Sequence, residues 1–153
     1  MPQILLTPIV MLALLTACDA PQQARGKTIT TQSGEQINRV HDPEEVKKGG
    51  EIFERHCAQC HGTNGEGDPE WRKRDVDGMF PPPPLNGTGH AWHHPTAFLK
   101  NRIKNGSAAD EGKMPAWDDK LSDKEVDAVI TWFQSQWPDE LYAAWYGIEQ
   151  RSR

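Results

Sequence analysis

The feature that most constrains this chain is the pentapeptide Cys57-Ala58-Gln59-Cys60-His61. Residues three or four apart in a helical turn lie on the same face, so both cysteines and the histidine point to one side. This arrangement suits two thioether bonds to the vinyl groups of a haem, with the neighbouring imidazole as the proximal iron ligand. The pentapeptide therefore predicts one haem attached covalently through Cys57 and Cys60, with His61 bound to the iron.

Two other uses of paired cysteines fit the sequence less well. A structural zinc site needs a second pair of ligands at a suitable spacing, but the only other cysteine is Cys18, in a separate N-terminal stretch. A thioredoxin-like redox pair belongs at a strand-to-helix turn, whereas the residues before Cys57 have helical periodicity. Covalent haem is therefore the favoured interpretation.

The composition agrees with a small domain built around a cofactor. The chain has 153 residues, enough for one domain plus appendages, and only 36% of them are hydrophobic. With 12 prolines and 13 glycines, a core made of protein alone would be thin, and a porphyrin would supply the missing apolar mass. The formal net charge of −5 argues against general nucleic-acid binding.

Capping residues and apolar spacing predict two long helices. Asp42 followed by Pro43 indicates that the first helix begins at Pro43, and Ser122 with Glu125 forms a capping box for the second. Apolar or small residues recur at i, i+4, i+7 and i+11 on one face of each helix: Val46, Gly50, Phe53 and Cys57 in the first, and Val126, Ile130, Phe133 and Trp137 in the second. We expect the two faces to cross at Gly50.

Several short motifs occur in an order that resembles the class I (monohaem) cytochromes c, over residues 43–137. They are Gly50-Glu51-Ile52-Phe53, the haem motif, Pro84-Leu85, Ile103-Lys104-Asn105-Gly106, Lys113-Met114-Pro115-Ala116-Trp117 and the closing helix that ends near Phe133. The resemblance implies an all-α cytochrome c fold, with about four to five helices wrapped around one covalent haem c. It also implies that Met114 is the distal iron ligand, that the Pro84 carbonyl accepts a hydrogen bond from His61, and that Trp117 packs near the haem edge.

The residues around Met114 support its assignment independently. Met114 precedes a proline in a polar loop without periodic apolar neighbours, so it does not look like a core-filling methionine. A thioether is a soft, neutral ligand, and His/Met ligation raises the reduction potential of a haem. Met79 is the reserve candidate for the distal position.

A loop rich in histidine leads into a third expected helix, from Pro95 to Asn105. Its three histidines, His90, His93 and His94, allow two further hypotheses: one of them is the distal iron ligand, or together they form a separate copper or zinc site. Clustered loop histidines are more often solvated or capping residues. We therefore keep both hypotheses behind Met114.

The N-terminus resembles that of a bacterial lipoprotein. Residues 1–17 contain an apolar run of 14, too short to span a membrane comfortably, and are expected to be a signal peptide that ends before a lipidated Cys18. The run lacks a preceding Lys or Arg, which departs from the usual pattern. Residues 18–42 are polar without an apolar period and are expected to form a flexible linker.

Two further segments lie outside the haem-binding motifs. Residues 138–153 are expected to form a C-terminal helical extension whose apolar stripe of Leu141, Trp145 and Ile148 folds back onto the domain. The segment Trp71-Arg72-Lys73-Arg74 places an aromatic residue beside three positive charges. It is either a solvated face or a docking site for an acidic partner.

These observations predict a membrane-tethered, monomeric electron carrier at the periplasmic face of the inner membrane, or at the outer face of the cytoplasmic membrane. With His61 and Met114 on the iron, the haem would exchange one electron at a time with transient redox partner proteins rather than bind a substrate. Two alternatives are a gas sensor or peroxidase-like enzyme with a labile distal ligand, and an electron-accepting subunit of a dehydrogenase or oxidase complex.

Overall fold

The computed structural model of the chain describes residues 26–110 and 112–153. The proposed signal peptide, Cys18 and the first part of the expected linker lie outside these residues. The described elements are β1 (Lys27–Thr30), β2 (Gln36–Arg39), α1 (Pro43–His56), α2 (Ala58–His61), the 3-10 turn η1 (Ala91–His93), α3 (Thr96–Asn105), the 3-10 turn η2 (Ala108–Asp110), α4 (Asp123–Ser135) and α5 (Asp139–Arg151). The mostly helical fold is confirmed. Within the described ranges, no helix has both the length and the apolar character needed to cross a membrane.

The helices begin where their capping residues predict. The Asp42 side chain accepts a hydrogen bond of 2.9 Å from the backbone N–H of Glu44, and Pro43 occupies the first helical position of α1. At the start of α4, Ser122 and Glu125 form a reciprocal capping box. These bonds satisfy backbone N–H groups that have no partner within the first turn of a helix.

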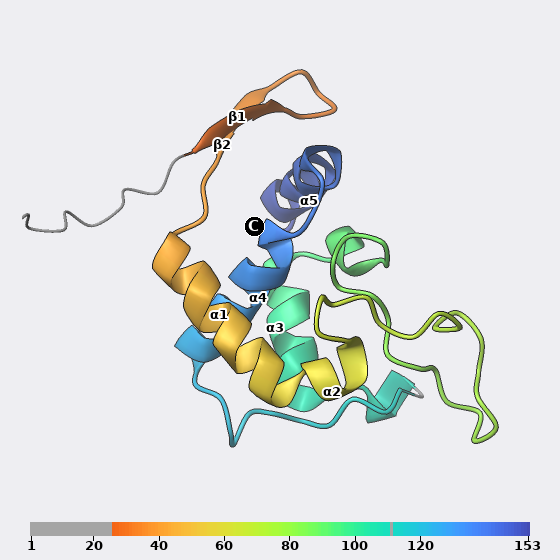
Figure 1. The fold of residues 1–153 in the computed structure, drawn as a ribbon. Helices are drawn as coiled ribbons and strands as arrows, with labels where there is room; N and C mark the ends of the chain where they lie inside the picture. The colour runs from red at the N-terminus through yellow and green to blue at the C-terminus, as the bar shows by residue number, and fades with distance from the viewer. Residues whose placement is uncertain (1–25, 111) are drawn as a thin grey trace, which may run out of the picture.

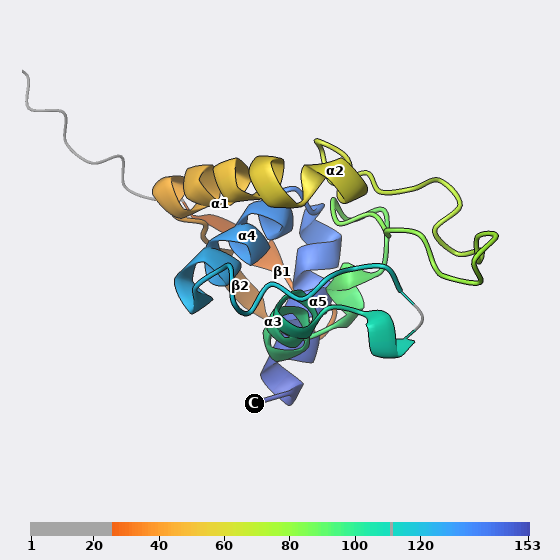
Figure 2. The same ribbon diagram turned by 90° about the horizontal axis from the view of Figure 1, so that it is seen from below.

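Helices α1 and α4 pack directly against each other (Figures 1 and 2). The closest approach is at Gly49 rather than at Gly50, where we expected the crossing. A Cβ atom on Gly49 would lie 2.0 Å from the backbone carbonyl oxygen of Ala128, whereas a Cβ atom on Gly50 would meet only the side chain of Trp132. The face of α1 that packs on α4 is therefore shifted by one residue from the predicted face. Gly49 has no side chain and so allows the two backbones to approach each other.

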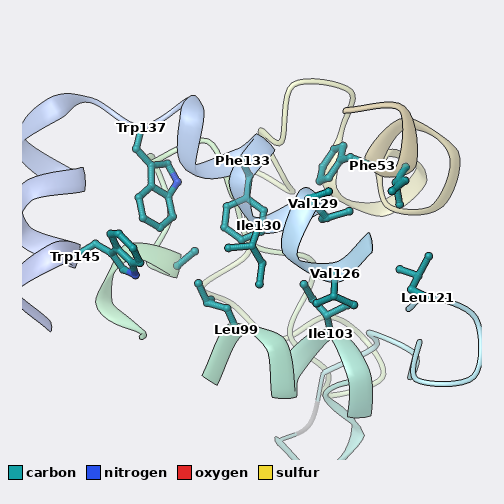
Figure 3. Packing of buried hydrophobic residues seen from close by; sticks show 13 residues of the cluster. Phe53, Leu99, Ile103, Leu121, Val126, Val129, Ile130, Phe133, Trp137 and Trp145 are labelled. Atoms are coloured by element: carbon teal, nitrogen blue, oxygen red, sulfur yellow. The ribbon is translucent and has the colours of Figure 1, made fainter. Parts of the chain in front are cut away.

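The main core lies between α1, α3 and α4 and continues to α5 (Figure 3). Phe53 of α1 and Val126 of α4 are its largest fully buried side chains. Figure 3 shows Phe133, Ile130 and Val129 of α4 in the centre, with Leu99 and Ile103 of α3 on one side and Trp137 and Trp145 beyond. Two residues of the predicted apolar stripe, Trp145 and Leu141, pack on this core, so α5 folds back onto the domain, whereas the third, Ile148, belongs to neither hydrophobic cluster of the described residues.

Residues 27–39 form an antiparallel β-hairpin, and the flexible linker expected over 18–42 is wrong for this part. Ile29 and Ile37 lie opposite each other in the two strands and are buried together with Ala143 of α5. The turn uses Gly34 with a φ of +85°. Each strand has only one buried isoleucine, so the alternation of apolar and polar residues is too short to be recognised in the sequence. The helix α5 that the hairpin covers lies about a hundred residues further along the chain.

Arg39, at the end of β2, fastens the hairpin to the junction between α4 and α5. Its guanidinium donates to the backbone carbonyls of Gln134 (2.8 Å), Ser135 (3.3 Å) and Trp137 (2.8 Å) and to the carboxylate of Asp139 (2.9 Å). The Arg39 side chain is only 9% exposed. A cation with several donors suits the carbonyl end of a helix, because the last carbonyls of α4 have no partner within the helix.

Candidate haem-binding site

A cavity of about 760 Å³ brings together residues that are far apart in the chain. Its walls come from the end of α1, from α2, from α3 and α4, and from the two loops that follow α2 and α3. Five predicted site residues line it: Cys57, Cys60, His61, Met114 and Trp117. Pro84, the other residue predicted for the haem site, is not among the lining residues, and the predicted lipidation site Cys18 lies outside the described part of the chain.

His61 ends α2 and is 8% exposed. Its Nδ1 lies 2.9 Å from the carbonyl oxygen of Pro83. The predicted partner was the carbonyl of Pro84, so the sequence assignment is off by one residue. Four consecutive prolines offer four equivalent acceptors, and the pairing of this stretch with residues 65–68 decides which carbonyl faces the imidazole.

This hydrogen bond determines which nitrogen of His61 can bind a metal. An imidazole that donates its Nδ1–H to a carbonyl leaves Nε2 as a lone-pair donor and has a fixed ring orientation. Burial lowers the pKa of His61, although the bond to Pro83 opposes this effect. The ring is therefore held neutral, which is the form that coordinates iron.

Both cysteines of the motif are free thiols on the same wall of the cavity. Cys57 joins α1 to α2 and is half-buried, whereas Cys60 is exposed. Burial, followed by the proximity of Cys60, raises the pKa of the Cys57 thiol to about 11. A thioredoxin-like pair needs a lowered thiol pKa, so the environment of Cys57 disfavours that interpretation.

Met114 is held at the cavity by the residues that follow α3. Its N–H donates to the hydroxyl oxygen of Ser107 (3.0 Å), and the N–H of Ser107 donates to the carbonyl of Met114 (3.0 Å). Met79, the reserve candidate, is not among the lining residues. The position of the two methionines thus favours Met114.

The three loop histidines do not all face the cavity, although the rings of His90 and His94 contact each other with centroids 5.5 Å apart. His90 and His94 line the cavity, where His90 stacks on Trp71 and His94 stacks on Phe98. His93 instead packs against Trp92 at a tilt of 31°, with ring centroids 3.6 Å apart. Within residues 26–110 and 112–153, no group of three or more His, Cys, Asp or Glu side chains is arranged to hold a metal ion. The geometry therefore gives the separate copper or zinc site no support.

Phe98 and Arg102 of α3 also belong to the site, although neither was predicted from the sequence. Both line the cavity, and Arg102 lies over the ring of Phe98. They are spaced at i and i+4, which places them on one face of α3, whereas His94 precedes this helix in an extended conformation. That spacing could have revealed them, but it is obscured because the inward residues Leu99 and Ile103 follow the same period.

The residues present fit a covalently bound haem. Two thiols three residues apart and a neutral imidazole with a free Nε2 lie on one wall of the cavity, a thioether belongs to the loop that follows α3, and much of the rest of the lining is apolar. This is the donor set of a His/Met-ligated haem c.

Comparisons with known proteins agree with this chemistry. Residues 44–133 match the family described as cytochrome c oxidase, cbb3-type, subunit III. The chain is 35% identical over 92 residues to the cbb3-type cytochrome c oxidase subunit FixP of Azorhizobium caulinodans, covering 60% of this chain and 27% of that protein. It is 31% identical over 94 residues to subunit CcoP of an Azospirillum species, covering 61% and 29%. The chain thus spans less than a third of the length of these relatives. No solved structure matches at a comparable significance.

Proposed function

This chain belongs to the family described as cytochrome c oxidase, cbb3-type, subunit III, and from that premise we propose that it transfers single electrons through one haem c. Membership of a cytochrome c family implies the covalent cofactor. When bound, the haem supplies an iron that alternates between the ferric and ferrous states. The single observation that carries the proposal is the convergence of Cys57, Cys60, His61 and Met114 on one cavity.

Each of these residues has a distinct task in the proposal. Cys57 and Cys60 would hold the porphyrin through thioether bonds, His61 would bind the iron through Nε2, and Met114 would supply the second iron ligand. Pro83 orients His61 by accepting its Nδ1–H, and the apolar lining keeps water away from the iron. With both protein ligands on the iron, the haem would exchange electrons with partner proteins rather than bind a substrate.

The partners follow from the relatives. FixP and CcoP are named as subunits of cbb3-type oxidases, so we propose that this chain exchanges electrons with an oxidase of that kind or with proteins that supply it. Contacts in such exchange are brief and small. We further propose that a lipid on Cys18 tethers the domain at the periplasmic face of the inner membrane, where a donor and an oxidase can both reach it.

A haem-based gas sensor or peroxidase-like enzyme is the second candidate. One observation favours it: His90 and His94 line the same cavity and could act as acid or base groups near a bound ligand. In that case Met114 would be labile or absent from the iron.

A visible spectrum with a redox titration of the purified holoprotein tests the proposal. We expect covalent haem, sulfur-to-iron charge-transfer absorption in the ferric state and a single reversible one-electron step. Met114→Ala should abolish the charge-transfer absorption, whereas Met79→Ala should retain it. The proposal is wrong if the ferrous parent binds carbon monoxide rapidly and stoichiometrically, because the distal position would then be open.

A further inference from the structure

The loop that carries Met114 has one attachment that the ligand assignment does not explain. Lys113, next to Met114, lies 2.5 Å from the carboxylate of Asp75 and 2.9 Å from that of Asp77. These acids belong to the other loop of the cavity wall, 36 or more residues earlier in the chain. One residue before Lys113, Gly112 forms a parallel β-bridge with Phe80 of the same loop.

The acidic side of this contact is well ordered by its own hydrogen bonds. The Oδ1 atom of Asp75 accepts from the N–H groups of Asp77 and Met79, both at 3.0 Å. The N–H of Asp75 in turn donates to the Met79 carbonyl at 2.9 Å. A turn closed in this way presents both carboxylates to Lys113 without further ordering of the backbone.

Within residues 26–110 and 112–153, the other backbone hydrogen bonds of the Met114 loop lead back to α3 or to residues of the loop itself, and the ring of Trp117 also contacts His56 of α1. Ser107 holds Met114 from within the loop, and the N–H of Trp117 donates to the carbonyls of Ile103 (3.2 Å) and Lys104 (3.0 Å) at the end of α3. None of these bonds joins the Met114 loop to the segment 75–83. That segment also contains Pro83, which orients the other axial residue, His61.

We propose that Lys113 is a positioning residue for the distal ligand: its ion pairs with Asp75 and Asp77 hold the Met114 loop against the segment 75–83, so that Met114 faces the iron that His61 binds. This inference rests on the proposed function, because it takes Met114 as the distal ligand. Segment 75–83 then connects both sides of the haem, through Lys113 on the distal side and through Pro83 on the proximal side.

The inference predicts how readily an added ligand displaces Met114. Imidazole binds ferric haem only when Met114 has left the iron, so its apparent affinity measures the open population. Exposed ion pairs contribute modestly, and we therefore expect Lys113→Ala to raise the imidazole affinity about two- to fivefold. The parent should also bind imidazole more tightly as salt screens the pairs, and Lys113→Ala should lose most of this salt dependence.

Matched variants separate positioning from a general loss of charge. Lys113→Arg keeps the cation and should behave like the parent. Lys100→Ala removes an equivalent cation, paired with Asp127 at 2.5 Å, but Lys100 does not line the cavity, so the imidazole affinity should not change. The double variant Asp75→Asn with Asp77→Asn keeps the side-chain acceptors that close the turn, and it should show the same imidazole affinity as Lys113→Ala. It therefore still tests the inference if Lys113→Ala does not fold.

Two results would overturn the inference, and they differ in what else they affect. If the parent shows sulfur ligation but Lys113→Ala and the asparagine variant bind imidazole with the parent's affinity and salt dependence, Lys113 has no positioning role and the proposed function stands. If instead the parent lacks sulfur-to-iron absorption and Met114→Ala leaves its spectrum unchanged, the ligand assignment fails and the inference fails with it.

Discussion

The loops around the cavity and the hairpin against α5 are stabilised in different ways. The loop side, residues 62–90 and 106–122, has little regular structure, and its first part extends away from the helices in Figures 1 and 2. The hairpin side, formed by β1, β2 and α5, consists of regular elements whose apolar side chains contact one another directly. The loop side therefore depends on what it encloses, whereas the hairpin side is stabilised by its own packing.

The largest expected effect comes from preventing haem attachment with Cys57→Ser and Cys60→Ser together. A cavity of about 760 Å³ lined mainly by apolar groups is far larger than the voids that protein interiors tolerate, so the loops should lose their fixed conformation. Hydrogen exchange should show residues 62–90 and 106–122 exchanging nearly as fast as an unfolded chain, while β1, β2 and α5 stay protected.

The control for this experiment is Met114→Ala, which keeps the thioether bonds and should leave most of the loop protection intact. Equal loss of protection on the hairpin side of the double variant would contradict the comparison, because it would mean that both sides unfold as one unit.

Arg39→Ala should have the second largest effect, and on the opposite side. It removes five hydrogen bonds, four to the junction of α4 and α5 and one to His41, and leaves the carbonyls of Gln134 and Trp137 without that donor. This should cost about 2–4 kcal/mol of unfolding free energy. Chemical denaturation of the holoprotein measures this loss. Lys27→Ala, which removes a mostly exposed ion pair to Asp139, should cost less than about 1 kcal/mol. A shifted haem spectrum in Arg39→Ala would show that the two sides are not independent.

The same contrast explains what the sequence could predict. The cavity side was predictable because Cys57, Cys60 and His61 are a short local motif, and Met114 follows in a proline-containing loop of recognisable character. The hairpin was missed because the burial of Ile29 and Ile37 depends on Ala143, more than a hundred residues away. The sequence placed the acceptor for His61 at Pro84 instead of Pro83. Which proline faces His61 depends on how this segment pairs with residues 65–68, and a run of identical residues does not specify that pairing.

Gly49→Ala tests whether the α1–α4 crossing supports both sides. The added methyl group would lie 2.0 Å from the Ala128 carbonyl oxygen, so the helices must separate, and we expect a loss of about 1–3 kcal/mol. Gly50→Ala meets only the movable side chain of Trp132 and should stay within about 1 kcal/mol of the parent, since alanine also favours the helix. Thermal unfolding followed by circular dichroism measures both. Equal losses would place the closest approach elsewhere than at Gly49.

The smallest expected effect is an acid dependence confined to the hairpin side. A hydrogen bond from Lys27 lowers the pKa of Asp139 from its ordinary value of 3.8. Burial opposes this effect, and a hydrogen bond from Arg39 lowers the pKa further. A carboxylate with a lowered pKa stabilises the folded form above its unfolded pKa, and this contribution is lost as the pH falls through the folded pKa. Hydrogen exchange at the amides of β1 and β2 should therefore accelerate as the pH falls below 3.8, relative to Asp139→Asn, in which this dependence should be absent.

Asp123→Asn is the control, because it removes a different carboxylate with a lowered pKa, one bound to Lys104 at the start of α4. It should leave the pH dependence of exchange in β1 and β2 unchanged. If Asp123→Asn reduced the pH dependence of exchange in β1 and β2 as much as Asp139→Asn does, the acid response would belong to the whole domain. The two sides of the molecule would then not be independent.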